Sequence, residues 1–265
     1  NPVTGSGGML IGIVEKIGPA LEGKTDLKVG DKIATLVSLS LTPLHIDEIL
    51  EIRKDIDQVD IKGKAILFES GIYAKLPDDI PENLALSVLD VAGAPAQTKK
   101  LVKEGQTVLI LGAAGKSGML CLYEAKKMAG PSGKVICLDY SDKSLENVKK
   151  LELADDYIVA DATDGIGVYD KVMELTNGEL CDTVIVNVNI QNCEMAAILS
   201  AKEGGTVYFF SMATDFTKAS LGAEGVYKDI NMIVGNGYCK GHAETALQIL
   251  RESEKIKKLY TELYA

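Results

Sequence analysis

Three glycines at a spacing of three residues, Gly112, Gly115 and Gly118, stand where an apolar run gives way to a helical pattern. The run at 108–111 has four apolar residues and predicts a buried parallel strand, and apolar residues then recur with helical period over 119–128. A glycine turn between a strand and a helix lets the main chain approach an anion closely, and the free N–H groups of the helix point at that charge. This pattern predicts the pyrophosphate-binding turn of a dinucleotide fold.

Most of the residues in this turn are expected to contact the cofactor. Lys116 brings a positive charge that would either neutralise the pyrophosphate or stay in solvent. The predicted contacts are Gly112, Ala114, Gly115, Lys116, Ser117 and Gly118.

A carboxylate ends the next predicted strand, at 135–139. Asp139 stands about twenty residues beyond the turn, where a dinucleotide fold needs an acceptor for the hydroxyls of the adenosine ribose. A carboxylate there repels a 2′-phosphate, and the following Tyr140 and Ser141 supply no cation. We therefore expect NAD rather than NADP, with Asp139 and Tyr140 near the adenosine. The alternative is that Asp139 only caps a helix that starts at Ser141 or Asp142.

Ligands of doubly wound sheets lie at the carboxyl ends of the strands. Residues that follow three later predicted strands are therefore expected beside the cofactor, unless they form solvent-facing turns. The first of these groups would face the adenine, and the second would face the ribose of the nicotinamide. They are Asp161 and Ala162, then Asn187, Val188 and Asn189, then Ser211 and Met212.

The composition narrows the class of partner. A net charge of −10 over 265 residues argues against nucleic acid or an anionic membrane. Five scattered cysteines without a C-x-x-C pair are typical of reduced thiols, and with only two histidines we expect no metal site. No apolar run reaches about 18 residues and no signal-peptide pattern is present, which predicts a soluble, cytoplasmic protein.

From residue 107 onward, predicted strands and helices alternate, as in a parallel α/β sheet with right-handed crossovers. The expected fold is therefore a Rossmann doubly wound parallel sheet. The expected strands are 107–111, 134–138, 157–160, 182–187, 205–210 and 230–235, and the expected helices are 117–128, 142–151, 165–175, 191–200 and 241–259.

The first part of the chain reads instead as a small β-rich domain. We expect strands at 9–17 and 65–72, a short helix at 47–53, and a helix over 82–102 that Gly93 and Pro95 interrupt. The predicted domains are a β-rich part at 1–90, an NAD-binding Rossmann domain at 91–240, and a C-terminal helix at 241–265 that packs at the domain junction.

Several segments resemble the medium-chain dehydrogenase/reductase superfamily, whose members join a GroES-like domain to a Rossmann domain. They are Gly-Ile-Val at 12–14, Val-Gly-Asp-Lys-Ile at 29–33, Lys-Leu-Pro-Asp-Asp-Ile-Pro at 75–81 and Gly-Gln-Thr-Val-Leu-Ile-Leu-Gly-Ala-Ala-Gly at 105–115. The resemblance implies a partial GroES-like domain, whose N-terminal portion precedes Asn1. Zinc-dependent members carry Gly-His-Glu where this chain has Gly-Ser-Gly-Gly-Met-Leu at 5–10, and no thiol stands near Asp90. A zinc-independent branch is therefore expected.

Three further segments are similar to one family of that superfamily, the L-erythro-3,5-diaminohexanoate dehydrogenases. They are Asn-Pro-Val-Thr-Gly-Ser-Gly-Gly-Met-Leu-Ile-Gly at 1–12, Ser-Leu-Ser-Leu-Thr-Pro-Leu at 38–44 and Leu-Asp-Val-Ala-Gly-Ala-Pro-Ala-Gln-Thr at 89–98. The resemblance implies that NAD accepts a hydride from C3 of the diamino acid while the 3-amino group leaves as ammonium. The product would be 5-amino-3-oxohexanoate, in anaerobic lysine fermentation. The resemblance also implies a homodimer, paired through an edge strand such as 230–235.

Such a deamination needs a base for the amine and fixed partners for the carboxylate and the second ammonium. Asp90 is the first candidate, because it stands in an apolar stretch at 85–94 where burial would raise the pKa of its carboxyl. It would act as a base or bind an ammonium group, or it is only a surface residue. Ser38 and Ser40 alternate along an extended segment and would bind the carboxylate, or hydrogen-bond only within a barrel.

Two other functions fit the same sequence. One is a zinc-independent NAD(P)H quinone or enoyl reductase, for which Gly-Ala-Ala-Gly at 112–115 is suitable but Asp139 is not. The other is a dinucleotide-binding protein without catalysis. The fold alone does not distinguish the deaminating dehydrogenase, the reductase and the non-catalytic binding protein. Measurements of cofactor preference and of the turnover of amines would distinguish them.

Overall fold

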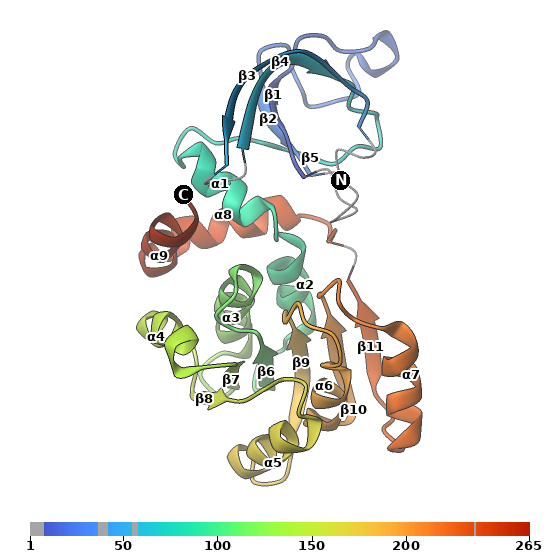
Figure 1. The fold of residues 1–265 in the computed structure, drawn as a ribbon, viewed down its shortest axis with the longest axis vertical. Helices are drawn as coiled ribbons and strands as arrows, with labels where there is room; N and C mark the ends of the chain where they lie inside the picture. Colours follow the sequence, from blue (N-terminus) through green and yellow to red (C-terminus); the bar gives the residue numbers. More distant parts are fainter. Residues whose placement is uncertain (1–7, 37–41, 55–57, 236) are drawn as a thin grey trace. The chain divides into compact units, whose positions relative to one another are not determined.

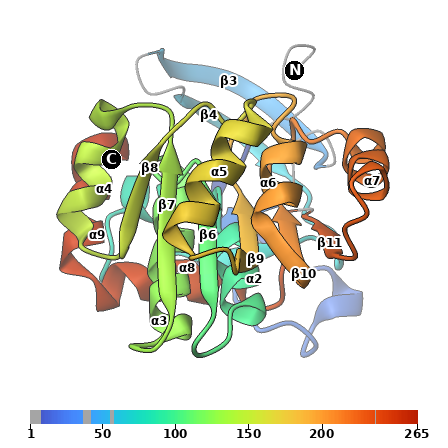
Figure 2. The ribbon, with the colours of Figure 1, turned by 90° about the horizontal axis from the view of Figure 1, so that it is seen from below.

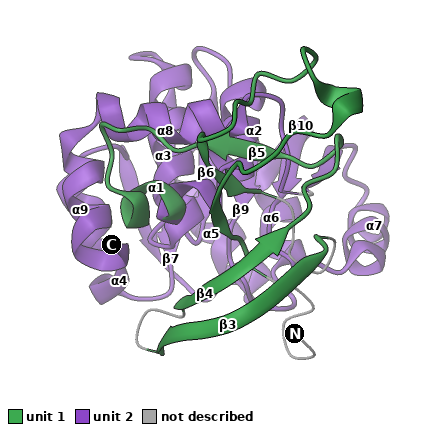
Figure 3. Cartoon of the chain, turned by 90° about the horizontal axis from the view of Figure 1, so that it is seen from above, with its two compact units in different colours: residues 1–86 green, residues 87–265 purple. Residues whose placement is uncertain are grey.

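The computed structural model describes residues 8–36, 42–54, 58–235 and 237–265. The chain divides into two compact units, residues 1–86 and residues 87–265, which Figure 3 draws in green and purple. The expected functional division into 1–90, 91–240 and 241–265 stays a prediction.

The second unit is built on one sheet of parallel strands (Figure 1). The strands are β6 (Thr107–Leu111), β7 (Lys134–Asp139), β8 (Asp156–Val159), β9 (Cys181–Val186), β10 (Ala201–Phe209) and β11 (Asn231–Val234). Their order across the sheet is β11-β10-β9-β6-β7-β8. In sequence order along the sheet this is 6-5-4-1-2-3, the arrangement of a Rossmann fold. The order reverses between β6 and β9, so the ends of these two strands flank the point where ligands bind in such sheets.

Helices cover both faces of this sheet (Figure 2). One face carries α5 (Gly165–Leu175), α6 (Glu194–Ser200) and α7 (Phe216–Gly225), whose apolar residues form one cluster with the inward side chains of the strands. The other face carries α2 (Gly93–Leu101), α3 (Lys116–Ala129), α4 (Asp142–Leu151), α8 (His242–Glu252) and α9 (Glu254–Tyr264). Because neighbouring residues of a strand point to opposite faces, strands covered on both sides are apolar throughout.

The sequence expectations for this unit are confirmed for the sheet, with exceptions among the helices. The single helix expected at 241–259 is wrong, because the chain is extended at Ser253 and that side chain caps a new helix by accepting from the N–H of Ile256. The helix α7 was not expected at all. The helix expected at 82–102 is interrupted, between α1 (Glu82–Leu89) and α2, but the position of the break is wrong. It lies at 90–92, and Gly93 and Pro95 belong to the first turn of α2, where a proline is tolerated because its missing N–H has no partner within the helix.

The first unit has a three-stranded antiparallel sheet and a separate hairpin. The sheet has the order β1-β2-β5 and is formed by β1 (Ile11–Ile13), β2 (Lys32–Thr35) and β5 (Tyr73–Lys75), with a short 3-10 helix η1 (Pro19–Leu21) between the first two strands. The hairpin pairs β3 (Leu44–Arg53) with β4 (Gln58–Ala65). The β-rich character expected for this part of the chain is confirmed.

Two local expectations in the first unit are wrong. The helix expected at 47–53 is part of β3, which has register shifts after Ile46 and after Ile49. Each such irregularity adds a residue to the strand, so the apolar spacing departs from strict alternation and imitates a helix. In place of the strand expected at 65–72, Ala65 ends β4 and residues 66–72 form a loop, which turns where the N–H of Gly71 donates to the carbonyl of Phe68 at 2.8 Å.

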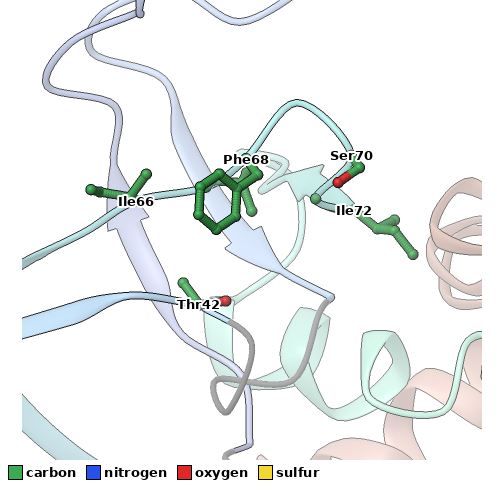
Figure 4. Close-up of a pocket in the computed structure, with 7 residues that line it drawn as sticks. Thr42, Ile66, Phe68, Ser70 and Ile72 are labelled. Atoms are coloured by element: carbon green, nitrogen blue, oxygen red, sulfur yellow. The ribbon is translucent and has the colours of Figure 1, made fainter.

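That loop encloses a hollow of about 310 Å³ in the first unit (Figure 4). Its lining is mostly apolar, and no charged side chain is among the described residues that form it. The lining residues are Thr42, Ile66, Leu67, Phe68, Ser70, Gly71 and Ile72. Over the described part of the chain, no helix combines the length and the apolar character needed to cross a membrane.

Candidate dinucleotide site

The glycine turn follows β6 and opens α3, and two of its glycines are required by the protein's own packing. Gly112 has a φ of +76°, and a Cβ there would lie 2.9 Å from the N–H nitrogen of Val188. A Cβ on Gly118 would lie 2.1 Å from the carbonyl oxygen of Gly112. These two glycines therefore allow the turn to pack closely against the end of β9 and the start of α3.

Gly115 differs from both. Its φ is −73°, which any residue can adopt, and a Cβ there would meet only the carbonyl oxygen of Gly112, at 3.4 Å. Nothing in the described protein therefore requires a glycine at this position. The absence of a side chain leaves the main chain open to a group from outside, as a bound pyrophosphate requires.

The start of α3 is suited to an anion. Gly115 is its N-cap residue and, within the described chain, no side chain accepts from its first N–H groups. Of the other described helices of this unit, α4, α5, α7 and α9 are each capped by a Ser or Asp side chain, whereas α2, α6 and α8 have no side-chain cap, as in α3. The uncapped N–H groups and the helix dipole favour negative charge here. Lys116 is the first residue of the helix, Ser117 is buried beside it, and both belong to the turn as predicted.

The Asp139 carboxylate at the end of β7 faces this turn. One of its oxygens accepts from the N–H of Ala114 at 2.9 Å, and the other accepts from the N–H of Tyr140 at 2.8 Å. The cap of α4 is Ser141, whose hydroxyl accepts from the N–H of Ser144, so Asp139 is not the helix cap. Each oxygen of Asp139 keeps a further lone pair for a hydroxyl donor. The Tyr140 side chain is exposed beside it.

The end of β9 lies against the same turn. The close approach of Gly112 to Val188 brings Asn187 next to the start of the turn. The side-chain oxygen of Asn187 accepts from the thiol of Cys121 at 3.8 Å. Its amide nitrogen is buried and has no hydrogen-bond partner among the described residues. A buried, unpartnered donor is costly in the free protein and fits an acceptor supplied by a ligand. Asn189, two residues further on, is exposed.

Of the remaining residues predicted at strand ends, Asp161 and Met212 are exposed and Ala162 is buried. Asp161 is exposed after β8, and hydrogen bonds from the N–H and hydroxyl of Thr163 hold the pKa of its carboxyl below the ordinary value. Ala162 beside it is buried. After β10, the hydroxyl of Ser211 accepts from the N–H of Ala213, and Met212 is 90% exposed.

The structure corrects the expected environment of Asp90. Its side chain is 51% exposed rather than buried, and its carboxylate lies 3.2 Å from the ammonium of Lys116. Asp90 follows the last residue of α1, and its place in an apolar sequence reflects buried neighbours rather than its own burial. The structure thus brings Asp90 to the glycine turn. Ser38 and Ser40 lie outside the described residues.

Two aromatic residues of α9 complete this end of the site, and the sequence analysis missed both. The hydroxyl of Tyr260 donates to the carbonyl of Lys116, and the ring centroid of Tyr264 lies 5.3 Å from the Lys116 ammonium. The two tyrosines also contact each other edge to face. Their spacing of four residues on one helix face was a visible signal, but nothing in the sequence indicated what they would contact.

The cysteines stand apart from this chemistry. All five are free and buried, and burial raises the pKa of the Cys121 thiol to about 12 and that of Cys193 to about 11. Within the described ranges, no three His, Cys, Asp or Glu side chains gather as a potential metal site.

Comparison with known sequences identifies close relatives. A family profile described as the L-erythro-3,5-diaminohexanoate dehydrogenase N-terminal domain matches residues 1–77. A protein of Acetoanaerobium sticklandii called L-erythro-3,5-diaminohexanoate dehydrogenase is 64% identical over 264 residues, which are 100% of this chain and 77% of that protein. A protein of Fusobacterium nucleatum subsp. nucleatum with the same description is 62% identical over 264 residues, which are 100% of this chain and 76% of that protein.

Solved structures share the fold at much lower sequence identity. A mycobacterial protein solved in complex with NADPH aligns with a TM-score of 0.60 and 19% identity, over 96% of this chain and 70% of that one. At this identity the likeness concerns the fold alone, and it agrees with the Rossmann-type parallel sheet described above.

Proposed function

The chain belongs to the family of L-erythro-3,5-diaminohexanoate dehydrogenases, and from this premise we propose that it removes the 3-amino group of L-erythro-3,5-diaminohexanoate by NAD-dependent oxidation. Hydride transfer to NAD would leave an iminium at C3, and addition of water followed by loss of the amino group would give 5-amino-3-oxohexanoate, ammonium and NADH. The reaction would belong to anaerobic lysine fermentation. As a member of this family the chain is an oxidoreductase. The proposal goes beyond family membership in three respects: the choice of NAD, the residues of the site and the assembly.

The observation that carries the proposal is the contrast among the three glycines. Gly112 and Gly118 are required by packing, whereas Gly115 leaves an open main chain at an uncapped helix start. That combination is what a dinucleotide pyrophosphate needs. The Asp139 carboxylate favours NAD, because it can accept from the ribose hydroxyls and would repel a 2′-phosphate.

The same turn suggests which residues would hold the cofactor. The main chain at Gly115 and the ammonium of Lys116 would bind the pyrophosphate, and Asp139 would bind the adenosine ribose. Asp161 and Ala162 would flank the adenine. Asn187, Val188 and Asn189, with Ser211 and Met212, would lie toward the nicotinamide. When bound, NAD supplies the acceptor for the hydride that leaves C3 of the substrate.

Asp90 is the proposed carboxylate of the reaction. It is exposed beside the glycine turn, so a cationic substrate can reach it. There it would either hold a substrate ammonium by charge-assisted hydrogen bonds or accept the proton that the 3-amino group must lose before hydride transfer. Ser38 and Ser40 remain predicted partners of the substrate carboxylate. The apolar hollow of the first unit offers no charged side chain among its described lining to bind either end of a diamino acid.

We also propose a homodimer. Among the described strands, β11 lies at the edge of the sheet and pairs with β10 alone, and Val234 at its end is exposed. An unpaired edge of this kind can continue the sheet across a two-fold axis.

The test is to incubate the protein with NAD and L-erythro-3,5-diaminohexanoate while following NADH absorbance and ammonium. NADH and ammonium that form in equal amounts support the proposal, and Asp90→Asn should then lower kcat. Reduction of a quinone or an enone with NADPH, in the absence of any reaction with the diamine, would contradict it.

A further inference from the structure

In the proposed complex, the ammonium of Lys116 would lie near two negatively charged groups, the Asp90 carboxylate and the pyrophosphate of the cofactor. In the structure its ammonium lies 3.2 Å from the Asp90 carboxylate and 5.3 Å from the centre of the Tyr264 ring. Its carbonyl accepts from the Tyr260 hydroxyl, which ties its main chain to α9. The residue is thus held on three sides, at the first position of the helix whose N–H groups face the pyrophosphate site.

A bound pyrophosphate would change the partners of this ammonium. It brings negative charge to the start of α3, where Asp90 already places a carboxylate. Two anions near one cation repel each other, and both partners of the existing pair are partly exposed, so the pair is weak enough to exchange. A phosphate oxygen that also receives the helix N–H groups is the stronger acceptor for Lys116.

We propose that Lys116 is a shared cation that pairs with Asp90 in the free protein and with the cofactor pyrophosphate in the complex. Cofactor binding then releases the Asp90 carboxylate for the ammonium group of the substrate. This inference rests on the proposed function and deepens it, because it makes Lys116 a positioning residue between cofactor and substrate. It predicts that the diamine binds more tightly to the cofactor complex than to the free protein, and that the coupling is reciprocal.

A double-mutant cycle with Lys116→Met and Asp90→Asn tests the proposal, with NADH affinity read by fluorescence titration and folding by thermal unfolding. We expect Lys116→Met to weaken NADH binding about tenfold, as for loss of a charge-assisted hydrogen bond. Asp90→Asn should tighten binding about two- to fivefold, because it removes a competitor for an exposed cation. In the Lys116→Met background, Asp90→Asn should have no effect.

A matched control removes another carboxylate. Glu254 begins α9, its side chain is 83% exposed, and it pairs with Lys257 of the same helix. Glu254→Gln changes the net charge equally and should leave NADH affinity unchanged.

Two results would overturn the proposal that Lys116 is a shared cation and would leave the proposed cofactor unaffected. Weaker NADH binding by Asp90→Asn would mean that Asp90 holds Lys116 in place rather than competing for it. Equal tightening in both backgrounds would mean that Asp90 acts through its charge at a distance. Failure of the wild-type chain to bind NADH would instead overturn the proposed cofactor, and the shared cation with it.

Discussion

The sheet of the second unit and the hairpin of the first contain similar apolar residues in very different surroundings. In β6 the residues from Val108 to Leu111 are completely buried, because helices cover both faces of the parallel sheet. In β3 every residue except Arg53 is exposed, including several isoleucines. Burial is therefore decided by what the connections place on each face, and side-chain type alone does not decide it.

This difference also concerns the site. The candidate cofactor residues follow strands that are fixed by a buried core, so the glycine turn and Asp139 sit on a rigid base. The two-stranded hairpin has no described helix or third strand paired with it, and two strands alone are marginally stable in water. Substitutions in the two regions should therefore lower the free energy of unfolding by very different amounts.

The largest expected effect compares the same substitution in the two regions. Ile110 in β6 is 0% exposed and Ile49 in β3 is 55% exposed. Ile110→Ala should lower the free energy of unfolding by about 4 kcal/mol, through lost burial and a cavity. Ile49→Ala should lower it by less than about 0.5 kcal/mol. Urea unfolding of both variants measures this, and a cost near 2 kcal/mol for Ile49→Ala would show that the hairpin is covered in solution.

A somewhat smaller effect separates two glycines of one turn. In Gly118→Ala the new Cβ would lie 2.1 Å from the carbonyl oxygen of Gly112, so we expect a loss of about 3 kcal/mol despite the higher helix propensity of alanine. In Gly115→Ala the nearest contact is 3.4 Å, and stability should change by no more than about 0.5 kcal/mol. Thermal unfolding compares the two. Equal destabilisation would contradict the assignment of Gly115 to a ligand rather than to packing.

The smallest effect concerns a buried carboxyl on α3. Glu124 is buried, one of its oxygens has no hydrogen-bond partner in the described part of the chain, and burial raises the pKa of its carboxyl. The folded state therefore binds this proton more tightly than the unfolded state, and the contribution of Glu124 to stability falls as the pH rises through the folded-state pKa. Glu124→Gln should be about 1 kcal/mol more stable than the parent near neutral pH.

That gain should disappear toward pH about 3, below the ordinary pKa of a glutamate, where the carboxyl is protonated in both states. Glu146→Gln, at an exposed position of α4, should change little at either pH. A gain for Glu124→Gln that does not depend on pH would show that titration of the carboxyl is not its cause.

The sequence was most informative where one physical signal was sufficient. Unbroken apolar runs located β6, β7 and β9 within about one residue, and the order of a Rossmann sheet then placed the strand ends together. The helix α7 was missed because Gly222 and Gly225 weaken its helical pattern, although Asp215 was a visible cap that accepts from the N–H of Lys218.

The contacts around Lys116 could not be predicted. They join Asp90, the glycine turn and α9, which lie far apart in the sequence, and packing of the whole second unit brings them together. Local patterns report which face of an element is buried, but they do not report which distant side chain it meets. For the same reason, the apolar neighbours of Asp90 suggested burial that the fold does not provide.

The most direct test of the account is a titration of NADH and NADPH into the wild-type protein and Gly115→Ala. The account predicts that the wild type binds NADH more tightly than NADPH, because Asp139 repels the 2′-phosphate. It also predicts that Gly115→Ala weakens binding of both nucleotides without lowering Tm. Unchanged NADH affinity in Gly115→Ala, or tighter binding of NADPH by the wild type, would contradict the proposed NAD site at the glycine turn.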